Sequence, residues 1–254
     1  MRANAYVIHT RPFQDNKVLV DCLTLEQGLM RGVWRLPKKE ARVLPGPFLC
    51  YEMEYSGRTD LKTIKSLESL SIPKTLQGVN LYAALYVHEL LTKLLPSNLP
   101  LSDVYHLYQW LIDSLHSGAP AAPILRRFEV GLFAELGAGI NMALTGRGEV
   151  LQAEQMYQFD AQFGLRPYHG DRLKQAPVLF VEGQLALNYA MGLWRDKQVL
   201  SLAKVLHRYW LDDLLQGKPI SARDLLPNTE YQGERLMGVP VFRLVPQVDP
   251  SQGL

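Results

Sequence analysis

The side chains best suited to chemistry in this chain of 254 residues are five cations within a stretch of twelve positions. They are Arg31, Arg35, Lys38, Lys39 and Arg42, and Glu40 is the acid among them. Strand alternation places Arg31 and Arg35 on the same face, and the other three follow in a loop. Cations spaced along a face and an adjoining loop can follow a phosphate backbone, so this stretch predicts DNA binding. A solvated basic face that keeps the protein soluble is the alternative.

A second candidate group lies at the start of an expected helix, in the run 125–129 (LRRFE). Arg126 and Arg127 stand near the helix N-terminus, whose field favours an anion. Leu125, Phe128 and Leu132 can line an apolar groove beside them. The run therefore predicts a receptor for a carboxylate next to apolar side chains. The alternative is an internal salt bridge, because Glu129 follows Arg126 at a three-residue spacing.

Residue patterns that indicate catalysis or a bound cofactor do not occur in the sequence. The six histidines stand singly, and no HExxH pair, nucleophile elbow, phosphate-cradling glycine loop or dinucleotide fingerprint is present. The two cysteines, Cys22 and Cys50, form no CxxC pair, which excludes the usual cysteine-based zinc site. They are expected to be free thiols in a reducing cytosol. We therefore expect no enzyme, no metal and no cofactor.

Charge is unevenly distributed along the chain. The net charge is only +2, but residues 1–75 contain 12 Lys and Arg against 8 Asp and Glu, and the remainder is net negative. A basic first third indicates that this part meets an anionic partner. No segment has the apolar core of a signal peptide or the length needed to cross a bilayer. We therefore expect a cytoplasmic protein without a membrane partner.

The segments that must position the first group of cations have the pattern of short strands. Alternating apolar residues separated by turns indicate strands at 6–10, 17–24, 29–36, 48–55 and 61–68. Five such strands favour a small closed barrel, either an oligonucleotide-binding OB-fold or an SH3-like barrel. Trp34, Tyr51 and Tyr55 alternate in phase with core residues, so contacts to phosphates are favoured over base stacking. We expect residues 1–77 to form a DNA-binding domain.

From residue 78 the hydrophobic period changes to that of helices. Helices are predicted at 78–95, 102–116, 124–136, 183–195 and 198–216, with an irregular, glycine-containing insert at about 140–178. We expect a helical domain over residues 78–226. The final stretch, 227–254, is polar and punctuated by proline and glycine, which predicts a loosely ordered tail. The fold class is α+β, a barrel followed by an all-helical body.

Several stretches, taken in order, resemble the RecO family of bacterial recombination mediators. The segment 5–13 (AYVIHTRPF), the strands around 23–35 and the start of the fifth strand at 61–64 are similar to the family's barrel. The LRRFE run resembles the helix before its zinc-binding region, and 217–225 resembles its closing helices. Many family members carry four cysteines after that helix, whereas 141–147 (NMALTGR) has none. We therefore expect a version without zinc.

The resemblance implies an N-terminal OB-fold, binding to single- and double-stranded DNA, and annealing of complementary strands. It also implies association with the bacterial nucleoid and partnership with RecR and with the C-terminal tail of single-stranded DNA-binding protein. RecA is an indirect partner, which the family helps to load onto covered DNA in gap and double-strand-break repair. The LRRFE helix is the expected site for the tail. Two alternatives stay open: a protein-interaction scaffold without DNA binding, and an enzyme acting on RNA.

Overall fold

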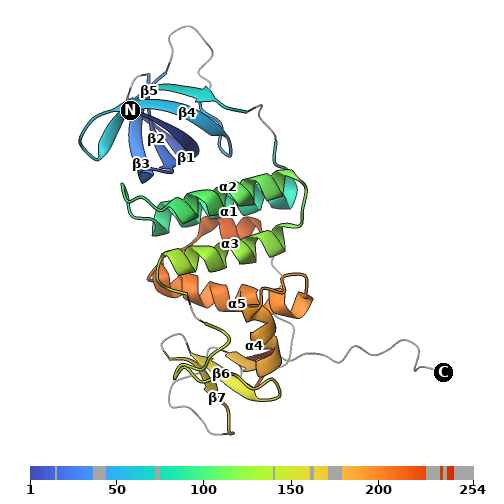
Figure 1. The fold of residues 1–254 in the computed structure, drawn as a ribbon. Coiled ribbons are helices and arrows are strands. Elements are labelled where there is room, and N and C mark those ends of the chain that lie inside the picture. The colour runs from blue at the N-terminus through green and yellow to red at the C-terminus, as the bar shows by residue number, and fades with distance from the viewer. Residues whose placement is uncertain are drawn as a thin grey trace, which may run out of the picture. The chain divides into compact units, whose positions relative to one another are not determined.

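The computed structural model describes residues 1–14, 16–36, 44–71, 75–139, 141–160, 163–170, 179–226, 235–236 and 239–242. By its internal contacts the chain divides into two compact units. The first comprises Met1–Gly137 and Leu215–Asn228, and the second comprises Ala138–Leu214 and Thr229–Leu254. Each unit has its own sheet and its own helices (Figure 1).

A closed barrel of five strands forms the N-terminal part of the first unit (Figure 1). The strands are β1 (Arg2–Gln14), β2 (Lys17–Thr24), β3 (Gly28–Arg35), β4 (Cys50–Ser56) and β5 (Leu61–Ser69). Their order is β1-β2-β3-β5-β4, with β3 and β5 parallel, the other neighbours antiparallel, and β1 paired with β4 to close the barrel. This is an OB-fold. The predicted barrel is confirmed, and the SH3-like alternative is not.

The barrel encloses a small apolar core to which all five strands contribute. Tyr51 and Tyr55 belong to this core, as their alternation predicts, and Trp34 packs against it. The buried members are Ala3, Ala5, Val7, Val18, Val20, Cys22, Met30, Leu36, Tyr51, Met53, Tyr55 and Ile64. Because these side chains alternate along each strand, the residues between them point to the outer surface of the barrel.

The first strand is longer than the sequence predicts. Arg11 and Pro12 indicate a break after residue 10, whereas β1 continues to Gln14 in pairing with β2. The pairing of β1 with β4 covers residues 2–6, so the later part of β1 has β2 as its partner strand and is an edge. Proline lacks an N–H donor and is tolerated on such an edge. The last four residues of β1 are consequently exposed.

Three α-helices follow in the first unit: α1 (Gly78–Leu94), α2 (Ser102–His116) and α3 (Ala121–Glu135). Helices α1 and α2 contact β1 of the barrel, and α3 packs against these two helices. Tyr6 of β1 contacts Tyr105 and Tyr108 of α2, with ring centroids 5.5 and 5.0 Å apart. His88 of α1 shares a 2.6 Å hydrogen bond with the Tyr108 hydroxyl and lies 4.6 Å from the ring of Phe48. Burial lowers the pKa of His88 to about 3, so this interface contains a neutral imidazole.

A short 3-10 helix, η1 (Ser221–Leu225), is fastened to α1 in the same unit. The Glu89 carboxylate accepts the backbone N–H groups of Ser221 at 2.9 Å and Ala222 at 2.8 Å. Lys93 forms a 2.6 Å ion pair with Glu89. The two hydrogen bonds from Ser221 and Ala222 join segments 132 and 133 residues apart in the sequence, so the end of the first unit is held by polar contacts as well as by packing.

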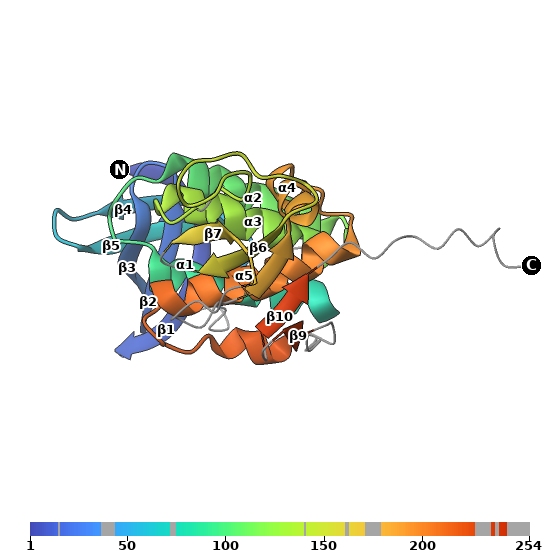
Figure 2. The ribbon, with the colours of Figure 1, turned by 90° about the horizontal axis from the view of Figure 1, so that it is seen from below.

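The second unit contains a five-stranded sheet in the order β7-β6-β8-β10-β9 and two helices (Figure 2). Its elements are β6 (Met156–Asp160), β7 (Gly164–Pro167), β8 (Leu179–Glu182), α4 (Gly183–Ala190), α5 (Lys197–Leu214), β9 (Arg235–Leu236) and β10 (Val239–Phe242). Phe159 of β6 meets Trp210 of α5 at a centroid distance of 5.7 Å. Tyr189 of α4 and His207 of α5 share a 2.7 Å hydrogen bond. The sheet and its helices therefore have a core of their own.

Two expectations for this unit are corrected in part. The insert expected to be irregular at 140–178 contains β6 and β7, whose pairing buries Phe159 and Leu165. The tail expected to be loosely ordered contributes β9 and β10, and β10 pairs in parallel with β8, with Val241 and Phe242 buried. The pairing of β10 with β8 joins segments about 60 residues apart in the sequence, which local periodicity does not report. Strands β6 and β7 are neighbours in the sequence, but at five and four residues they are too short to show a clear alternation. Across the described residues, no helix is both long enough and apolar enough to cross a membrane.

Candidate nucleic-acid interface

The outer surface of β1, β2 and β3 gathers cations from three strands. Val18 and Val20 of β2 face the barrel core, so alternation turns Lys17, Leu19 and Asp21 outward. Residues directly opposite each other on antiparallel strands share a face. Three outward rows result: His9–Asp21–Arg31, then Arg11–Leu19–Val33, then Lys17–Arg35. We call the surface that carries Arg11, Lys17, Arg31 and Arg35 the cation face.

The cations of this face differ in how firmly they are held. Arg31 makes a bidentate ion pair with Asp21, with distances of 2.5 Å from Nε to Oδ1 and 3.1 Å from Nη2 to Oδ2. The hydrogen bond to Asp21 raises the pKa of Arg31, and Asp21 itself is buried. Arg11 and Arg35 are exposed, and the described residues form no ion pair with either. Arg31 is therefore fixed and partly neutralised, whereas Arg11 and Arg35 present full charges to solvent.

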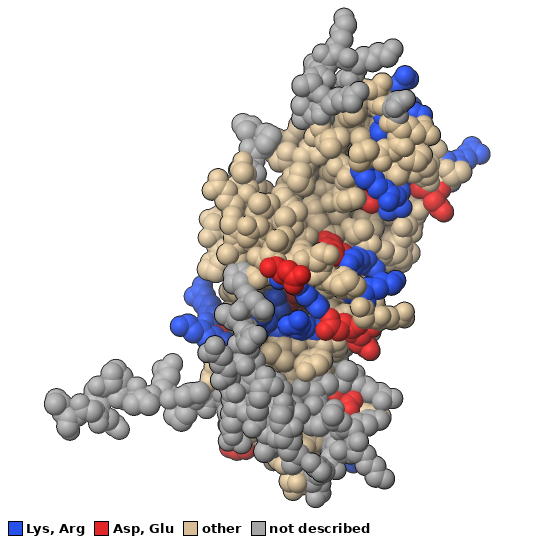
Figure 3. All heavy atoms as spheres, turned by 180° about the vertical axis from the view of Figure 1, so that it is seen from behind, with Lys and Arg blue, Asp and Glu red and all other residues tan. Residues whose placement is uncertain are grey.

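Strands β4 and β5 carry acids instead. Glu52 and Glu68 are exposed and lie opposite each other in the sheet. Glu54 pairs with Lys65 at 3.8 Å, which offsets the charge of that lysine. In Figure 3, Lys and Arg side chains lie over the barrel with few Asp or Glu side chains among them. Lys62 and Lys65 of β5 are thus accompanied by three acids on the two strands, so an approaching polyanion is attracted more strongly to the cation face than to β4 and β5.

The structure places two of the five cations that the sequence singles out. Arg31 and Arg35 lie on one face of β3, as strand alternation predicts. Lys38, Lys39 and Arg42 lie outside the described residues. The sequence does not reveal that Arg11 and Lys17 share this face, because Arg11 stands where a turn is expected. Their membership follows from the register of β1 on β2 and of β2 on β3.

Removing Asp21, the acid that engages Arg31, tests the role of the cation face. Asp21→Asn is expected to raise DNA affinity several-fold and to steepen the salt dependence by about one released counterion, because Arg31 is freed to meet a phosphate. Glu54→Gln removes one negative charge from the same barrel and is the matched control. Fluorescence anisotropy titrations at several salt concentrations measure both. Equal gains for the two variants would show that total charge, not the position of Asp21, decides.

The LRRFE helix is built differently from the groove that its sequence predicts. Leu125, Phe128 and Leu132 are buried in the core, between 0 and 3% exposed, so they do not line an open groove. Arg126 forms a 2.9 Å ion pair with Glu129, which is the internal salt bridge that the spacing allows. Of the expected residues, Arg127 remains at the surface.

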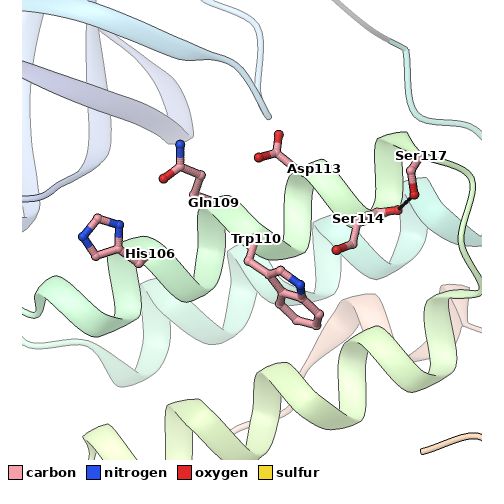
Figure 4. A pocket seen from close by; sticks show the side chains of 6 residues that line it. All are labelled: His106, Gln109, Trp110, Asp113, Ser114 and Ser117. Atoms are coloured by element: carbon pink, nitrogen blue, oxygen red, sulfur yellow. Dashed lines mark hydrogen bonds between the residues drawn. The ribbon is translucent and has the colours of Figure 1, made fainter.

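Arg127 lies beside a depression on α2 rather than beside the expected leucines. Its guanidinium carbon stands 4.5 Å from the centre of the Trp110 ring. Trp110 points from α2 towards α3 and helps to line an open depression of about 510 Å³ (Figure 4). The lining residues are His106, Gln109, Trp110, Asp113, Ser114 and Ser117. A cation, an indole ring and hydroxyl groups thus meet at one place on the helical layer.

No metal site emerges from the part of the chain that is described. Within it, no group of three or more His, Cys, Asp or Glu side chains is arranged to hold a metal ion. Cys22 and Cys50 are both free thiols, and burial raises the pKa of Cys22 to about 12. The absence of zinc from this protein stays a prediction, which metal analysis of chelator-washed protein can check.

The closed barrel and its helical layer define an OB-fold protein with a helical extension. Two family models match the chain: Recombination protein O N terminal over residues 1–73, and Recombination protein O C terminal over residues 76–221. The chain therefore belongs to the RecO family, and the resemblance found in the sequence is confirmed.

Individual relatives agree with the family match. The chain is 36% identical over 223 residues to the DNA repair protein RecO of Pseudomonas paraeruginosa, which covers 88% of this chain and 93% of the relative. It is 34% identical over 228 residues to that of Stutzerimonas stutzeri, with coverages of 90% and 94%. It is 31% identical over 224 residues to the DNA repair protein RecO of Pseudoalteromonas translucida, with coverages of 87% and 95%. The family is thus one of DNA repair and recombination proteins.

Proposed function

We propose that this protein is a DNA-binding recombination mediator that acts without a chemical step of its own. In this role it binds single- and double-stranded DNA, anneals complementary strands and, with RecR, helps RecA to load onto DNA covered by single-stranded DNA-binding protein. The repair of gaps and double-strand breaks is the setting. The cation face on β1, β2 and β3 carries the proposal, because it presents exposed arginines along an OB-fold surface.

The mechanism is electrostatic capture. Phosphates of one strand displace counterions at Arg11, Lys17 and Arg35, and this release of ions supplies the affinity. Such contacts fix the position of the strand without reading its sequence. Two strands held near one barrel have a raised local concentration, so complementary stretches meet more often. No cofactor is required for this, and residues 1–77 are the proposed DNA-binding domain.

Salt dependence distinguishes this function from a scaffold that binds protein alone. We expect Arg11→Ala combined with Arg35→Ala to weaken binding about tenfold and to lower the slope of log affinity on log salt by about one to two. Random-sequence single-stranded and duplex oligonucleotides serve as probes, and both should be affected. Arg58→Ala combined with Lys65→Ala removes the same charge from the β4–β5 side and should change little.

A second variant, with Lys38, Lys39 and Arg42 replaced by Ala, tests how much the cations that follow β3 in the sequence contribute to DNA affinity and its salt dependence. An unchanged slope in both this variant and the face variant, with the fold intact, would move the DNA site elsewhere, to helical cations such as Lys204 and Arg208. Wild-type protein without salt-dependent DNA binding would favour the scaffold. Release of labelled products from RNA would favour the enzyme.

We also propose that the acidic C-terminal tail of single-stranded DNA-binding protein docks on the helical layer. Arg127 would meet a carboxylate and Trp110 would supply the apolar surface beside it, since the two side chains are already in contact. Asp113 in the same depression disfavours a second carboxylate there, which orients the tail towards Arg127.

Arg127→Ala is expected to weaken binding of a fluorescent tail peptide by one to two decades, as loss of a charge-assisted contact implies, roughly 1.5–3 kcal/mol. Binding to naked DNA should stay nearly unchanged. Trp110→Ala tests the apolar half of the same site. Normal tail binding in both variants would direct the search to the last two helices.

A further inference from the structure

One aromatic ring of the barrel is left out of its core. Among the Phe, Tyr and Trp side chains of the described barrel, Phe13 is the exposed one, at 44%. Tyr6, Tyr51 and Tyr55 are 3 to 6% exposed, and Trp34 packs against the core. A lone exposed phenyl group is common on protein surfaces, so its surroundings decide whether it has a role.

The backbone around Phe13 is irregular in a way that presents its side chain. The register of β1 on β2 shifts between Pro12 and Gln14, which leaves Phe13 as the extra residue of a β-bulge. Bulges re-aim a side chain relative to the regular alternation and are frequent beside functional sites. Phe13 also lies in the exposed end of β1, where β2 is the partner strand.

Cations of the cation face surround this position in the sheet. Arg11 precedes Phe13 by two residues on β1. Lys17 is paired in register with Gln14, and its Nζ lies 3.0 Å from the Gln14 side-chain oxygen. Arg35 is paired in turn with Lys17. The ring therefore stands at the end of the face on which phosphates would lie.

We propose that Phe13 stacks an unpaired base and so makes the cation face prefer single-stranded DNA. The inference rests on the proposed DNA-binding function and names the form of DNA that this end of the face selects. An anionic strand is the occupant that the flanking cations favour. Every base has a flat face that a phenyl ring can cover, so stacking is independent of sequence. In a duplex those faces are already stacked on neighbouring bases, so no base face is free to stack on the Phe13 ring.

The test compares single-stranded and duplex DNA of the same sequence in anisotropy titrations. Phe13→Ala is expected to weaken single-strand binding about tenfold, the usual cost of losing one stacked base, and to leave duplex binding unchanged. The salt slope should not change, because no charge is removed. Phe13→Tyr should bind like the wild type, because it keeps a ring. Leu61→Ala, which alters another exposed apolar side chain of the barrel, is the matched control.

A second readout observes stacking directly. A single-stranded oligonucleotide carrying 2-aminopurine should lose fluorescence on binding to the wild type and to Phe13→Tyr, and lose less on Phe13→Ala. The inference would be overturned if Phe13→Ala bound single-stranded DNA as well as the wild type does, or if it bound single strands and duplexes with equally weakened affinity. The exposed ring would then be a candidate contact for a protein partner. Urea unfolding of each variant confirms that the fold is intact. Wild-type protein that binds neither DNA form would overturn the proposed function and this inference together.

Discussion

Replacing Arg126 by Ala is expected to lower the free energy of unfolding by about 3 to 5 kcal/mol, because it leaves a buried carboxylate without its close cation. Glu129 is fully buried, and its Oε2 lies 2.9 Å from Nη1 of Arg126. The Tyr86 hydroxyl donates to Oε1 at 2.7 Å. Burial, and then the charge of Glu129, raise the pKa of Tyr86 well above its ordinary value, so the hydroxyl keeps its proton. The ion pair thus belongs to a buried network between α1 and α3.

Urea unfolding at neutral pH measures this effect in a double-mutant cycle. Arg126→Ala combined with Glu129→Gln removes the buried charge as well, so the double variant should be more stable than Arg126→Ala alone. Arg127→Ala is the neighbouring control. Its exposed guanidinium stacks on Trp110, and a loss of about 1 kcal/mol or less is expected. If Arg126→Ala and Arg127→Ala were equally stable, the network would not be a structural element of α3.

This contrast also decides how the tail proposal can be tested. A variant at Arg126 that loses tail binding would not identify a contact, because the helix itself is weakened. Arg127 is the informative position, since its side chain is exposed and its removal is expected to leave the fold unchanged. We therefore expect Arg126→Ala to lower stability and Arg127→Ala to weaken tail binding, although the two arginines are adjacent in one helix.

Gly28→Ala is the second substitution from which we expect a large loss, about 3 kcal/mol or more in the free energy of unfolding. Gly28 begins β3 at φ 62°, in the left-handed region that favours glycine. A Cβ atom there would stand 1.9 Å from the Leu99 carbonyl oxygen, so backbone would have to move. Beside it, the Asn98 N–H donates to the Leu29 carbonyl at 2.8 Å. The substitution thus disturbs the place where the β2–β3 turn meets the connection between α1 and α2.

Gly137→Ala separates backbone strain from collision. Gly137 follows α3 at φ 68°, and a Cβ atom there meets nothing within 4 Å. It should cost about 1 kcal/mol, the strain alone. The difference between the two variants in urea unfolding then reports the contact with Leu99. If the two variants lost the same free energy of unfolding, the β2–β3 turn would accommodate the added Cβ atom without a collision with Leu99. Other contacts would then fix the barrel on the helices.

Local patterns in the sequence determined the barrel and most helices correctly. The alternation of Val18, Val20 and Cys22 is a property of neighbouring residues, and it is enough to place β2 and to turn Asp21 outward. The same holds for Arg31 and Arg35 on β3. The ordered stretches that resemble the RecO family lie in the barrel and in the helical part of the first unit, and they were enough to recognise the family without coordinates.

Tertiary structure alone decided which side chains share a surface. Arg11 looks like part of a turn until β1 pairs with β2, and the register then aligns it with the other cations and exposes Phe13 at a bulge. Leu125 and Phe128 look like the lining of a groove until the neighbouring helices bury them. Strand β10 forms by pairing with β8, about 60 residues earlier in the chain. Pairing register and burial are set by contacts between distant segments, and such contacts leave no periodic signal in either segment by itself.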